Sequence, residues 1–312
     1  LLTLERFLGI LHSPLSAVAL FHRDAAALET LLAIVATSPY LAEIVLAEPD
    51  TWEQIRRGGG RPEKREALRE VLRAEIGGQT DSRLVMRALR RFKRREVLRI
   101  AYGDIVMGQR LETVVGQISA VADCVVAEAV RVAWDRQRQL RGEPQEADGR
   151  PATLAVLALG KLGGNELNYS SDIDLIGCYS AEGRVVGPKP CTNDEFFQRV
   201  VQEATRLIGE TTELGAAYRV DLRLRPHGGQ GPLVLPLVAM QRYYDQQGRT
   251  WERQAWVKAR CIAGDEALGN RLLAGLEPWI YSRWLNRADI SGIRALKRRI
   301  EQRAIREGAD AA

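Results

Sequence analysis

The sequence predicts an α+β protein, in which a small mixed β-sheet is flanked by N-terminal and C-terminal α-helical regions. Helical periodicity of apolar residues fills the first part of the chain. Two continuous apolar runs of strand length follow between residues 152 and 180, and helical periodicity returns after residue 237. We therefore expect a helical N-terminal region at 1–145, a sheet-containing domain at 150–265 and the start of a C-terminal helical region, apparently truncated, at 266–312.

The N-terminal region shows apolar residues three and four positions apart, and prolines at the ends of its helical patterns. The pattern at 82–101 predicts a helix with an apolar face and a largely exposed basic face. We expect Leu84, Met86, Leu89 and Phe92 inside, and Arg83, Arg87, Arg90, Arg91, Lys93, Arg94 and Arg95 outside. A further long helix is expected at 111–139. The segment 141–151 is polar and contains glycine and proline, so it is the expected domain boundary.

The sheet domain is expected to begin with strands at 153–159 and 172–179, separated by a glycine turn. Thr192 and Glu195 form a capping-box pattern that predicts a helix to about residue 208. Residues 218–226 alternate between apolar and charged side chains, which predicts a half-exposed strand. Helical patterns then follow at 237–247, 251–262, 266–284 and 290–306.

Composition excludes several classes of protein. The chain has 312 residues, of which 46% are hydrophobic, so more than one domain with a real core is expected. No apolar run looks long enough for a membrane span. The four cysteines contain no CxxC pair, and the three histidines have no metal-ligand spacing. These features favour a cytoplasmic protein with reduced thiols. The chain lacks an initiator Met and a signal-peptide pattern, so we read it as a fragment of a longer polypeptide.

Asp172 and Asp174 are the strongest candidates for chemistry. Alternate residues of a strand share a face, so the two carboxylates should lie about 7 Å apart on one side. Asp221, on a different predicted strand, could join them if the two strands pair. Three carboxylates suit a two-metal site for Mg²⁺, with Mn²⁺ as an alternative, and such sites serve nucleotidyl transfer.

Glycines and cations around these aspartates suggest phosphate binding. Gly160, Gly163 and Gly164 would let the backbone approach a phosphate closely. Lys161, Arg223 and Arg225 are candidates to bind its oxygens. The structural alternative is that Asp172 and Asp174 only serve as caps or form salt bridges with neighbouring arginines. The basic run at 93–95 is expected to be a solvated helical face, because no aromatic residues interleave with it as a nucleic-acid stacking platform.

The segment from Leu159 to Ile176 resembles the nucleotidyltransferase motif of the glutamine synthetase adenylyltransferase/adenylyl-removing enzyme family. Further segments follow in the order and spacing of that family, at 89–101, 218–226, 231–235, 243–253 and 257–260. The resemblance implies a polymerase-β-like nucleotidyltransferase core, in which Asp172, Asp174 and Asp221 bind Mg²⁺. It also implies that the Gly163-Gly164 turn and Ser171 contact the nucleotide.

The resemblance further implies a direction for the reaction. Residues 166–174 read Glu-Leu-Asn-Tyr-Ser-Ser-Asp-Ile-Asp, as in the adenylyl-removing half of the family. The implied reaction is phosphorolysis of adenylylated glutamine synthetase to free tyrosine and ADP. Glu166, Asn168, Glu252 and Arg253 are then candidate supporting residues. Two alternatives are forward transfer of AMP from ATP, and a non-catalytic module that binds a regulatory partner such as a PII signalling protein. No membrane or nucleic-acid partner is expected.

Overall fold

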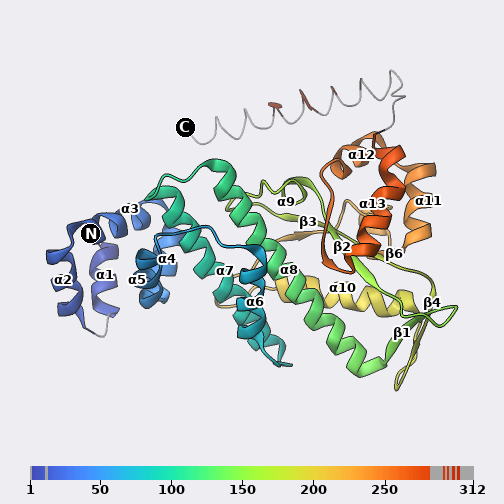
Figure 1. Ribbon diagram of the computed structural model, residues 1–312, viewed down its shortest axis with the longest axis horizontal. Helices are drawn as coiled ribbons and strands as arrows, with labels where there is room; N and C mark the ends of the chain where they lie inside the picture. The colour runs from blue at the N-terminus through green and yellow to red at the C-terminus, as the bar shows by residue number, and fades with distance from the viewer. Residues whose placement is uncertain are drawn as a thin grey trace. The chain divides into compact units, whose positions relative to one another are not determined.

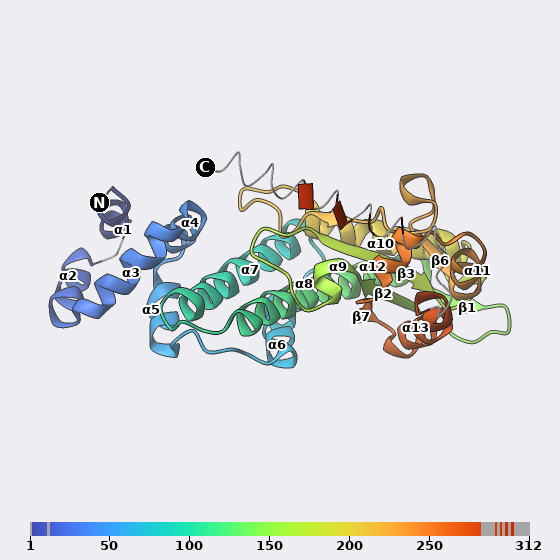
Figure 2. The same cartoon turned by 90° about the horizontal axis from the view of Figure 1, so that it is seen from above.

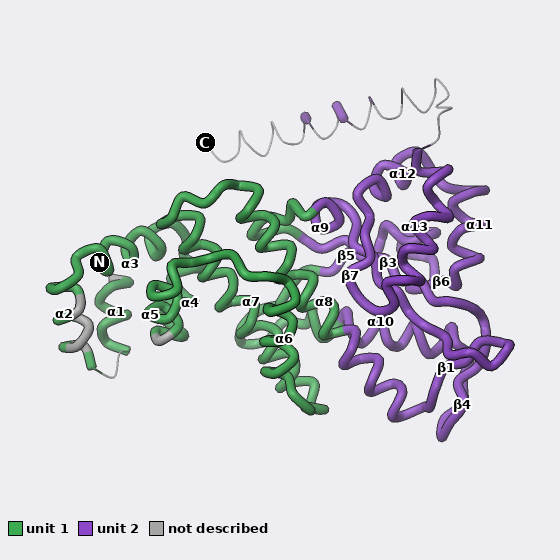
Figure 3. Tube along the Cα trace, in the orientation of Figure 1, with its two compact units in different colours: residues 1–129, 165–171, 206–219 green, residues 130–164, 172–205, 220–312 purple. Residues whose placement is uncertain are grey.

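The computed structural model describes residues 2–10 and 13–281, with a few isolated positions between 291 and 302 (Figure 1). The chain folds into two compact units, which are coloured separately in Figure 3. Unit 1 contains Leu1–Ala129, Asn165–Ser171 and Arg206–Arg219, and unit 2 contains Val130–Gly164, Asp172–Thr205 and Val220–Ala312. These units interleave along the sequence, unlike the consecutive domains at 1–145, 150–265 and 266–312 that we expected. The predicted helix at 290–306 lies largely outside the described residues.

The N-terminal part of the chain is helical, as predicted. Its helices are α1 Leu2–Ile10, α2 Pro14–Arg23, α3 Ala25–Thr37, α4 Pro39–Ala47, α5 Pro49–Gly58, α6 Arg65–Ile76, α7 Ser82–Ile105 and α8 Leu111–Arg141. Pro39 and Pro49 are the first residues of their helices, where the missing N–H costs nothing. Asp24 caps α3 by accepting a hydrogen bond from the Ala27 N–H at 3.2 Å.

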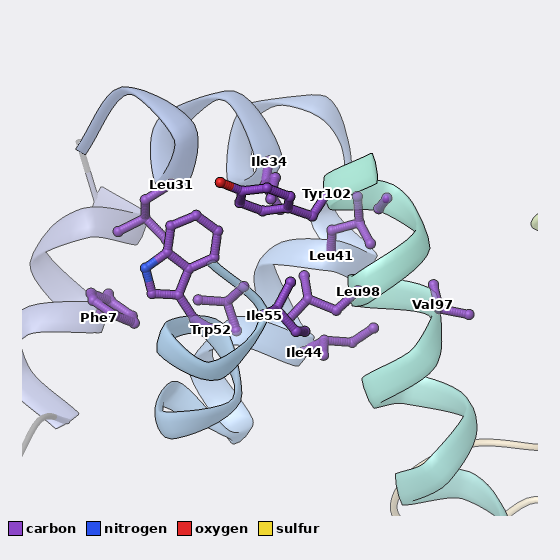
Figure 4. Packing of buried hydrophobic residues seen from close by; sticks show 12 residues of the cluster. Phe7, Leu31, Ile34, Leu41, Ile44, Trp52, Ile55, Val97, Leu98 and Tyr102 are labelled. Carbon is purple, nitrogen blue, oxygen red and sulfur yellow. The ribbon is translucent and has the colours of Figure 1, made fainter. Parts of the chain in front are cut away.

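The core of unit 1 brings the early helices onto one face of α7 (Figure 4). Trp52 of α5 packs beside Tyr102 of α7, with ring centroids 5.8 Å apart. Around this pair lie Phe7, Leu31, Ile34, Leu41, Ile44, Val45, Ile55, Val97, Leu98 and Ala101. Each large apolar side chain buried in this way contributes roughly 1.5–3 kcal/mol.

The basic residues of α7 correct a sequence prediction, because several of them are not solvated. Arg90 is 1% exposed, and Arg94 is buried as well. Arg90 donates hydrogen bonds to backbone carbonyls of Met86, Leu207, Ile208, Glu210 and Gly215, all within unit 1. The Lys93 ammonium bonds to the Ala217 carbonyl at 2.6 Å and lies over the Tyr218 ring. These cations therefore hold the segment 206–219 in unit 1 instead of facing solvent.

Helix α8 corrects the expectation that no segment is long and apolar enough to cross a membrane. It is the one helix among the described residues that meets both criteria. However, 78% of its most apolar window is buried inside the protein. We conclude that α8 is a core helix.

The main sheet of unit 2 has five strands in the order β5-β3-β2-β7, and β6 also pairs with β3. Their bounds are β2 Leu154–Ala158, β3 Ile173–Tyr179, β5 Val220–Asp221, β6 Val234–Pro236 and β7 Arg260–Gly264. β2 is antiparallel to β3 and β7, whereas β5 and β6 are parallel to β3. The predicted small mixed sheet is confirmed.

Residues 141–151, the expected domain boundary, lie within unit 2. They include β1 Glu143–Glu146, which forms an antiparallel two-stranded sheet with β4 Gly183–Val186. A capping box does open α10 Asn193–Gly209 as predicted. In it, the Glu195 N–H donates to Thr192 Oγ1 and the Thr192 N–H donates to a Glu195 carboxylate oxygen, at 3.1 and 3.2 Å.

Helices cover both faces of the main sheet (Figure 2). The helices α11 Leu237–Gln247, α12 Thr250–Trp256 and α13 Glu266–Ile280 pack on the face that carries Leu157, Ile176 and Cys178. On the opposite face, Phe197 of α10 stacks on Tyr179 of β3 with ring centroids 5.0 Å apart. Both central strands are thus buried on two sides, which explains their continuous apolar sequences.

Two predicted elements of unit 2 are wrong, one strand and one helix. The expected strand at 218–226 is reduced to Val220–Asp221, and the chain then enters a turn. The expected helix at 251–262 ends at Trp256, and Arg260–Gly264 forms strand β7. The helix expected at 266–284 is confirmed as far as Ile280.

Candidate active site

Asp174 and Asp221 lie side by side on neighbouring strands. β3 and β5 are parallel, and Asp174 is the register partner of Asp221. Register partners in adjacent parallel strands project their side chains to the same face. Asp172, two residues before Asp174, is next to the start of β3 and has the same parity. The pairing of these strands, on which the predicted site depends, is therefore present in the structure.

The Asp174 carboxylate is crowded and only partly exposed. A Cβ on Gly160 would lie 2.6 Å from Asp174 Oδ2, so only glycine fits at that position, where φ is also +56°. Burial raises the pKa of Asp174 to about 6, with further raising contributions from the Asp221 and Asp172 charges. The three carboxylates therefore act electrostatically as one cluster.

Asp221 is neutralised by a neighbouring arginine. Arg223 donates through Nε to Oδ1 and through Nη2 to Oδ2 of Asp221, at 3.0 and 2.5 Å. The Arg223 backbone N–H also donates to Asp221 Oδ1 at 2.8 Å. These hydrogen bonds from Arg223 hold the pKa of Asp221 below its usual value. Asp221 is thus paired with Arg223, a cation that the sequence suggested for phosphate binding.

Gly160, Lys161 and Gly163 form the one-turn helix α9 Gly160–Gly163 in place of an open glycine turn. A Cβ on Gly163 would lie 2.5 Å from the Lys258 carbonyl oxygen and 2.8 Å from that of Ala158. Gly163 therefore has no room for a side chain, and its role at a phosphate stays a prediction. Lys161 is exposed and directly follows the glycine that contacts Asp174. The roles of Lys161 and Gly164 in phosphate binding stay predictions.

Arg260 supports the site from a strand, although the sequence predicted a helix for its segment. From β7 it donates to the carbonyl oxygens of Leu162 and Gly163, at 2.9 and 3.2 Å. Arg260 thereby ties α9 to the sheet, and α9 in turn abuts Asp174. Strand β7 could have been suggested by the apolar run that follows Arg260 and ends at Gly264.

Arg225 has a structural role, which corrects its assignment to phosphate binding. Its side chain is buried and donates to the carbonyl oxygens of Leu222, Gly229, Gly231 and Pro232. It thus braces the loop between β5 and β6, both of which pair with the same strand β3. The glycines and prolines between residues 226 and 232 are the sequence signal for such a loop.

Glu166, Asn168 and Ser171 belong to the segment Asn165–Ser171, which is part of unit 1. Ser171 Oγ donates to the Asn168 side chain, so these two residues bond to each other. Two bonds hold the segment within its unit. The Leu167 N–H donates to Ser119 Oγ at 3.1 Å, and the Tyr169 hydroxyl donates to an Asp104 carboxylate oxygen at 3.1 Å. Their predicted nucleotide and supporting roles stay predictions.

Glu252 and Arg253 stabilise the helical face of unit 2. Glu252 is buried and accepts hydrogen bonds from the Arg249 N–H and the Tyr243 hydroxyl, at 2.8 and 3.0 Å. It is therefore the N3 residue of a capping box at the start of α12, whose N-cap is Arg249. The Arg253 guanidinium lies 5.5 Å from the centroid of the Trp279 ring. These contacts agree with a supporting role and give no direct link to the carboxylates.

The carboxylate cluster suits a hard divalent cation by its chemistry, although it is not arranged as a finished metal cage. Among the described residues, no group of three or more His, Cys, Asp or Glu side chains is close enough together to hold a metal ion. Arg223 supplies the positive charge at Asp221. Asp172, Asp174 and Asp221 nonetheless provide oxygen ligands, which Mg²⁺ and Mn²⁺ prefer, at a place where negative charges repel one another.

Comparison with known proteins identifies the family. Residues 28–275 match the family glutamate-ammonia ligase adenylyltransferase, GlnE. The chain belongs to this family. The match confirms the resemblance drawn from the motifs, and it places the carboxylate cluster inside the matched GlnE region.

Individual GlnE relatives agree with this assignment. The chain is 37% identical over 280 residues, or 89% of its length, to a protein of Thioalkalivibrio sulfidiphilus. It is 35% identical over 98% of its length to one of Hahella chejuensis, and 42% identical over 73% to one of Nitrosococcus oceani. All three relatives are named bifunctional glutamine synthetase adenylyltransferase/adenylyl-removing enzyme. The chain spans 29%, 32% and 24% of their lengths, respectively.

Replacing Arg260 should impair any activity of this site while the fold persists. In Arg260→Met the carbonyls of Leu162 and Gly163 lose their donor, so α9 shifts relative to Asp174. A displacement of about 1 Å costs up to roughly 100-fold in rate. We expect a 10- to 100-fold loss of turnover in an adenylyl-transfer assay. The exposed Arg184→Met on β4 is the control, and equal losses in both variants would contradict this role.

Proposed function

We propose that the carboxylate face of unit 2 is the catalytic site of a polymerase-β-like nucleotidyltransferase core. Its reaction would be removal of AMP from adenylylated glutamine synthetase by phosphorolysis. The parallel, in-register pairing of Asp174 with Asp221 carries this proposal, because it sets two carboxylates from different strands on one face. Asp172 lies directly before β3, and its charge acts on Asp174. The GlnE membership of the chain supports adenylyl transfer as the class of chemistry.

Each residue of the site has a task in this reaction. Asp172, Asp174 and Asp221 would hold Mg²⁺ or Mn²⁺, which supplies charge neutralisation at phosphate oxygens and alignment of the reacting groups. Gly160 has no side chain, so its backbone can lie directly beside the Asp174 carboxylate. Lys161 and Arg223 would bind phosphate oxygens, whereas the Arg225 side chain is hydrogen-bonded to its own loop. Such positioning and charge stabilisation supply most of the catalysis in phosphoryl-type transfers.

The bonds formed and broken define the proposed reaction. An oxygen of inorganic phosphate attacks the α-phosphorus of the AMP that is esterified to a tyrosine of glutamine synthetase. The new phosphorus–oxygen bond produces ADP, and the bond to the tyrosine oxygen breaks. The tyrosine oxygen takes up the proton that the attacking phosphate releases. The reaction thus needs no water as a nucleophile.

The sequence of the motif supports the removing direction over forward transfer. Residues 166–174 have the Glu-Leu-Asn-Tyr-Ser-Ser-Asp-Ile-Asp form that is typical of the adenylyl-removing half of the family. The names of the relatives cover both activities, so the forward reaction with ATP is the alternative. Both would use the same carboxylates.

An assay with the chain itself separates these possibilities. The 312-residue chain is incubated with adenylylated glutamine synthetase and Mg²⁺, with and without inorganic phosphate, and nucleotides are separated by chromatography. We expect ADP only when phosphate is present. Incorporation of AMP from ATP into unmodified glutamine synthetase, without phosphate-dependent ADP, would replace this proposal by the forward reaction. The absence of both would favour a binding module.

A matched pair of variants tests whether the carboxylates do the chemistry. Asp172→Asn should lose ADP formation by about 100-fold or more, because a neutral amide is a weak ligand for a hard cation. Asp148→Asn is the control, since Asp148 is exposed and lies in the turn after β1. Equal turnover in the two variants would contradict a role for Asp172.

A further inference from the structure

Arg223 donates hydrogen bonds to both carboxylate oxygens of Asp221, and a metal ion that binds Asp221 would have to displace it. Its Nε and Nη2 atoms donate to Oδ1 and Oδ2, and its own backbone N–H reinforces Oδ1. A two-pronged guanidinium contact uses the same in-plane lone pairs that a divalent cation would use. Binding of a metal ion at Asp221 and this contact with Arg223 therefore exclude each other in part.

The Arg223 side chain is exposed to solvent, whereas the backbone around it is held in place. The side chain is 81% exposed, although its partner Asp221 is only 19% exposed. The backbone on either side is held by the β5 pairing with β3 and by the buried Arg225, which braces the loop. Exposed ion pairs contribute little net stability, so releasing the side chain costs little. The Arg223 side chain can thus leave Asp221 by rotation about its own bonds, without movement of the backbone.

Arg223 also interacts electrostatically with the rest of the cluster. The charges of Asp174 and Asp172, as well as that of Asp221, stabilise its positive charge. Arg223 is therefore bonded to Asp221, and the charges of Asp174 and Asp172 act on it more weakly. Once a divalent cation replaces it at Asp221, the guanidinium becomes available to an anion at the same place.

We propose that Arg223 is a placeholder cation, which holds Asp221 until a divalent cation binds and then turns to the incoming phosphate. This inference rests on the proposed function and adds a competition between one side chain and the metal. It explains why an exposed arginine two residues from Asp221 is bonded to that aspartate instead of to solvent. It predicts that loss of Arg223 strengthens metal binding and weakens phosphate binding, two opposite effects of one substitution.

Direct titration with Mn²⁺ tests the competition without any turnover. Mn²⁺ binding to the 312-residue chain is measured by electron paramagnetic resonance in the absence of nucleotide and phosphate. We expect Arg223→Gln to bind Mn²⁺ about 3- to 10-fold more tightly than the wild type, as removal of an exposed competing pair allows. Arg223→Lys keeps the positive charge but loses the two-pronged guanidinium contact. Its affinity for Mn²⁺ should therefore lie between those of the wild type and Arg223→Gln. Arg184→Gln on β4 removes an equal charge elsewhere and should leave the Mn²⁺ affinity at the wild-type value.

The outcomes of the titration distinguish the two proposals. Unchanged or weaker Mn²⁺ binding in Arg223→Gln, or wild-type affinity in Arg223→Lys, would overturn the placeholder role even if the chain releases ADP. Tighter Mn²⁺ binding in Arg223→Gln, in a chain that releases no ADP, would uphold the placeholder and defeat the proposed function. If neither the wild type nor Arg223→Gln binds Mn²⁺, both proposals fail.

Steady-state kinetics test the second half of the exchange. In ADP release from adenylylated glutamine synthetase, Arg223→Gln should raise the KM for phosphate about 10-fold, the loss expected for one charge-assisted hydrogen-bond partner. The concentration of Mn²⁺ required for half-maximal rate should fall in the same variant. A higher requirement for Mn²⁺ would contradict the placeholder role.

Discussion

Asp174→Asn should abolish phosphorolysis and, in the absence of metal, stabilise the folded chain at neutral pH. Turnover is expected to fall by about 1,000-fold or more, because we propose Asp174 as a ligand of the catalytic cation. The gain in stability follows from the crowding of carboxylates around Asp174, which makes the charged form costly. Such opposite effects on activity and stability are usual for residues held in strained functional sites.

The pH dependence of this gain can be worked out from the pKa. Burial and the neighbouring carboxylates raise the pKa of Asp174 to about 6, above its ordinary value of 3.8. Between these values the folded chain keeps a proton that the unfolded chain releases, so stability falls as pH rises from about 4 to 6. Asp174→Asn removes this cost, which we put at about 1–3 kcal/mol above pH 6. The advantage should vanish below pH 4.

Urea denaturation between pH 4 and 8, with chelator present, measures this effect. Asp221→Asn is the matched comparison, because Arg223 lowers the pKa of Asp221. Its carboxylate therefore stabilises the fold above its unfolded pKa, and this contribution is lost as pH falls through the folded value. Asp221→Asn should thus reduce stability at pH 7. An Asp174→Asn chain that is less stable than the wild type at pH 7 would show that the cluster is not under electrostatic strain.

Arg90→Met should cause the largest loss of stability of any single substitution considered for unit 1. It leaves the carbonyls of Leu207, Ile208, Glu210 and Gly215 without their donor in a buried place. Each buried hydrogen-bond partner left unsatisfied costs about 1–3 kcal/mol, and several are affected together. The segment 206–219 should then loosen within unit 1.

Arg87→Met on the same helix provides the control for Arg90→Met. Arg87 is exposed, so its replacement should change the free energy of unfolding by less than about 0.5 kcal/mol. Hydrogen exchange would locate the effect of Arg90→Met, with faster exchange expected at the amides of residues 206–219. A loss of stability below about 1 kcal/mol, without faster exchange there, would refute the bracing role of Arg90.

The sequence was informative where local patterns have one physical solution. The apolar runs of β2 and β3 reflect burial on both faces, and the Thr192–Glu195 capping box fixed the start of α10. The spacing of Asp172 and Asp174 predicted a shared face, and Asp221 proved to be the register partner of Asp174. Alternation and capping depend on neighbours in sequence, so the sequence can reveal them.

Other features depend on backbone groups that are distant in sequence. The pattern of α7 places its arginines on a polar face, but it does not show that carbonyls of the segment 206–219 require donors from Arg90. Likewise, Arg225 belongs to the alternating pattern that predicted a strand at 218–226. The strand β5 ends after Asp221, and Arg225 instead donates to backbone carbonyls of the loop that follows. In both cases an arginine taken as solvent-facing or ligand-binding satisfies buried backbone carbonyls.

The most direct test of the catalytic site follows the fate of the attacking phosphate. The chain is incubated with adenylylated glutamine synthetase, Mg²⁺ and ³²P-labelled inorganic phosphate, and the position of the label in the product is determined. Our account predicts ADP labelled in its β-phosphate, with no labelled ADP from Asp174→Asn or Asp221→Asn. Unlabelled AMP as the product, or labelled ADP at equal rates from the aspartate variants, would contradict phosphorolysis at these carboxylates.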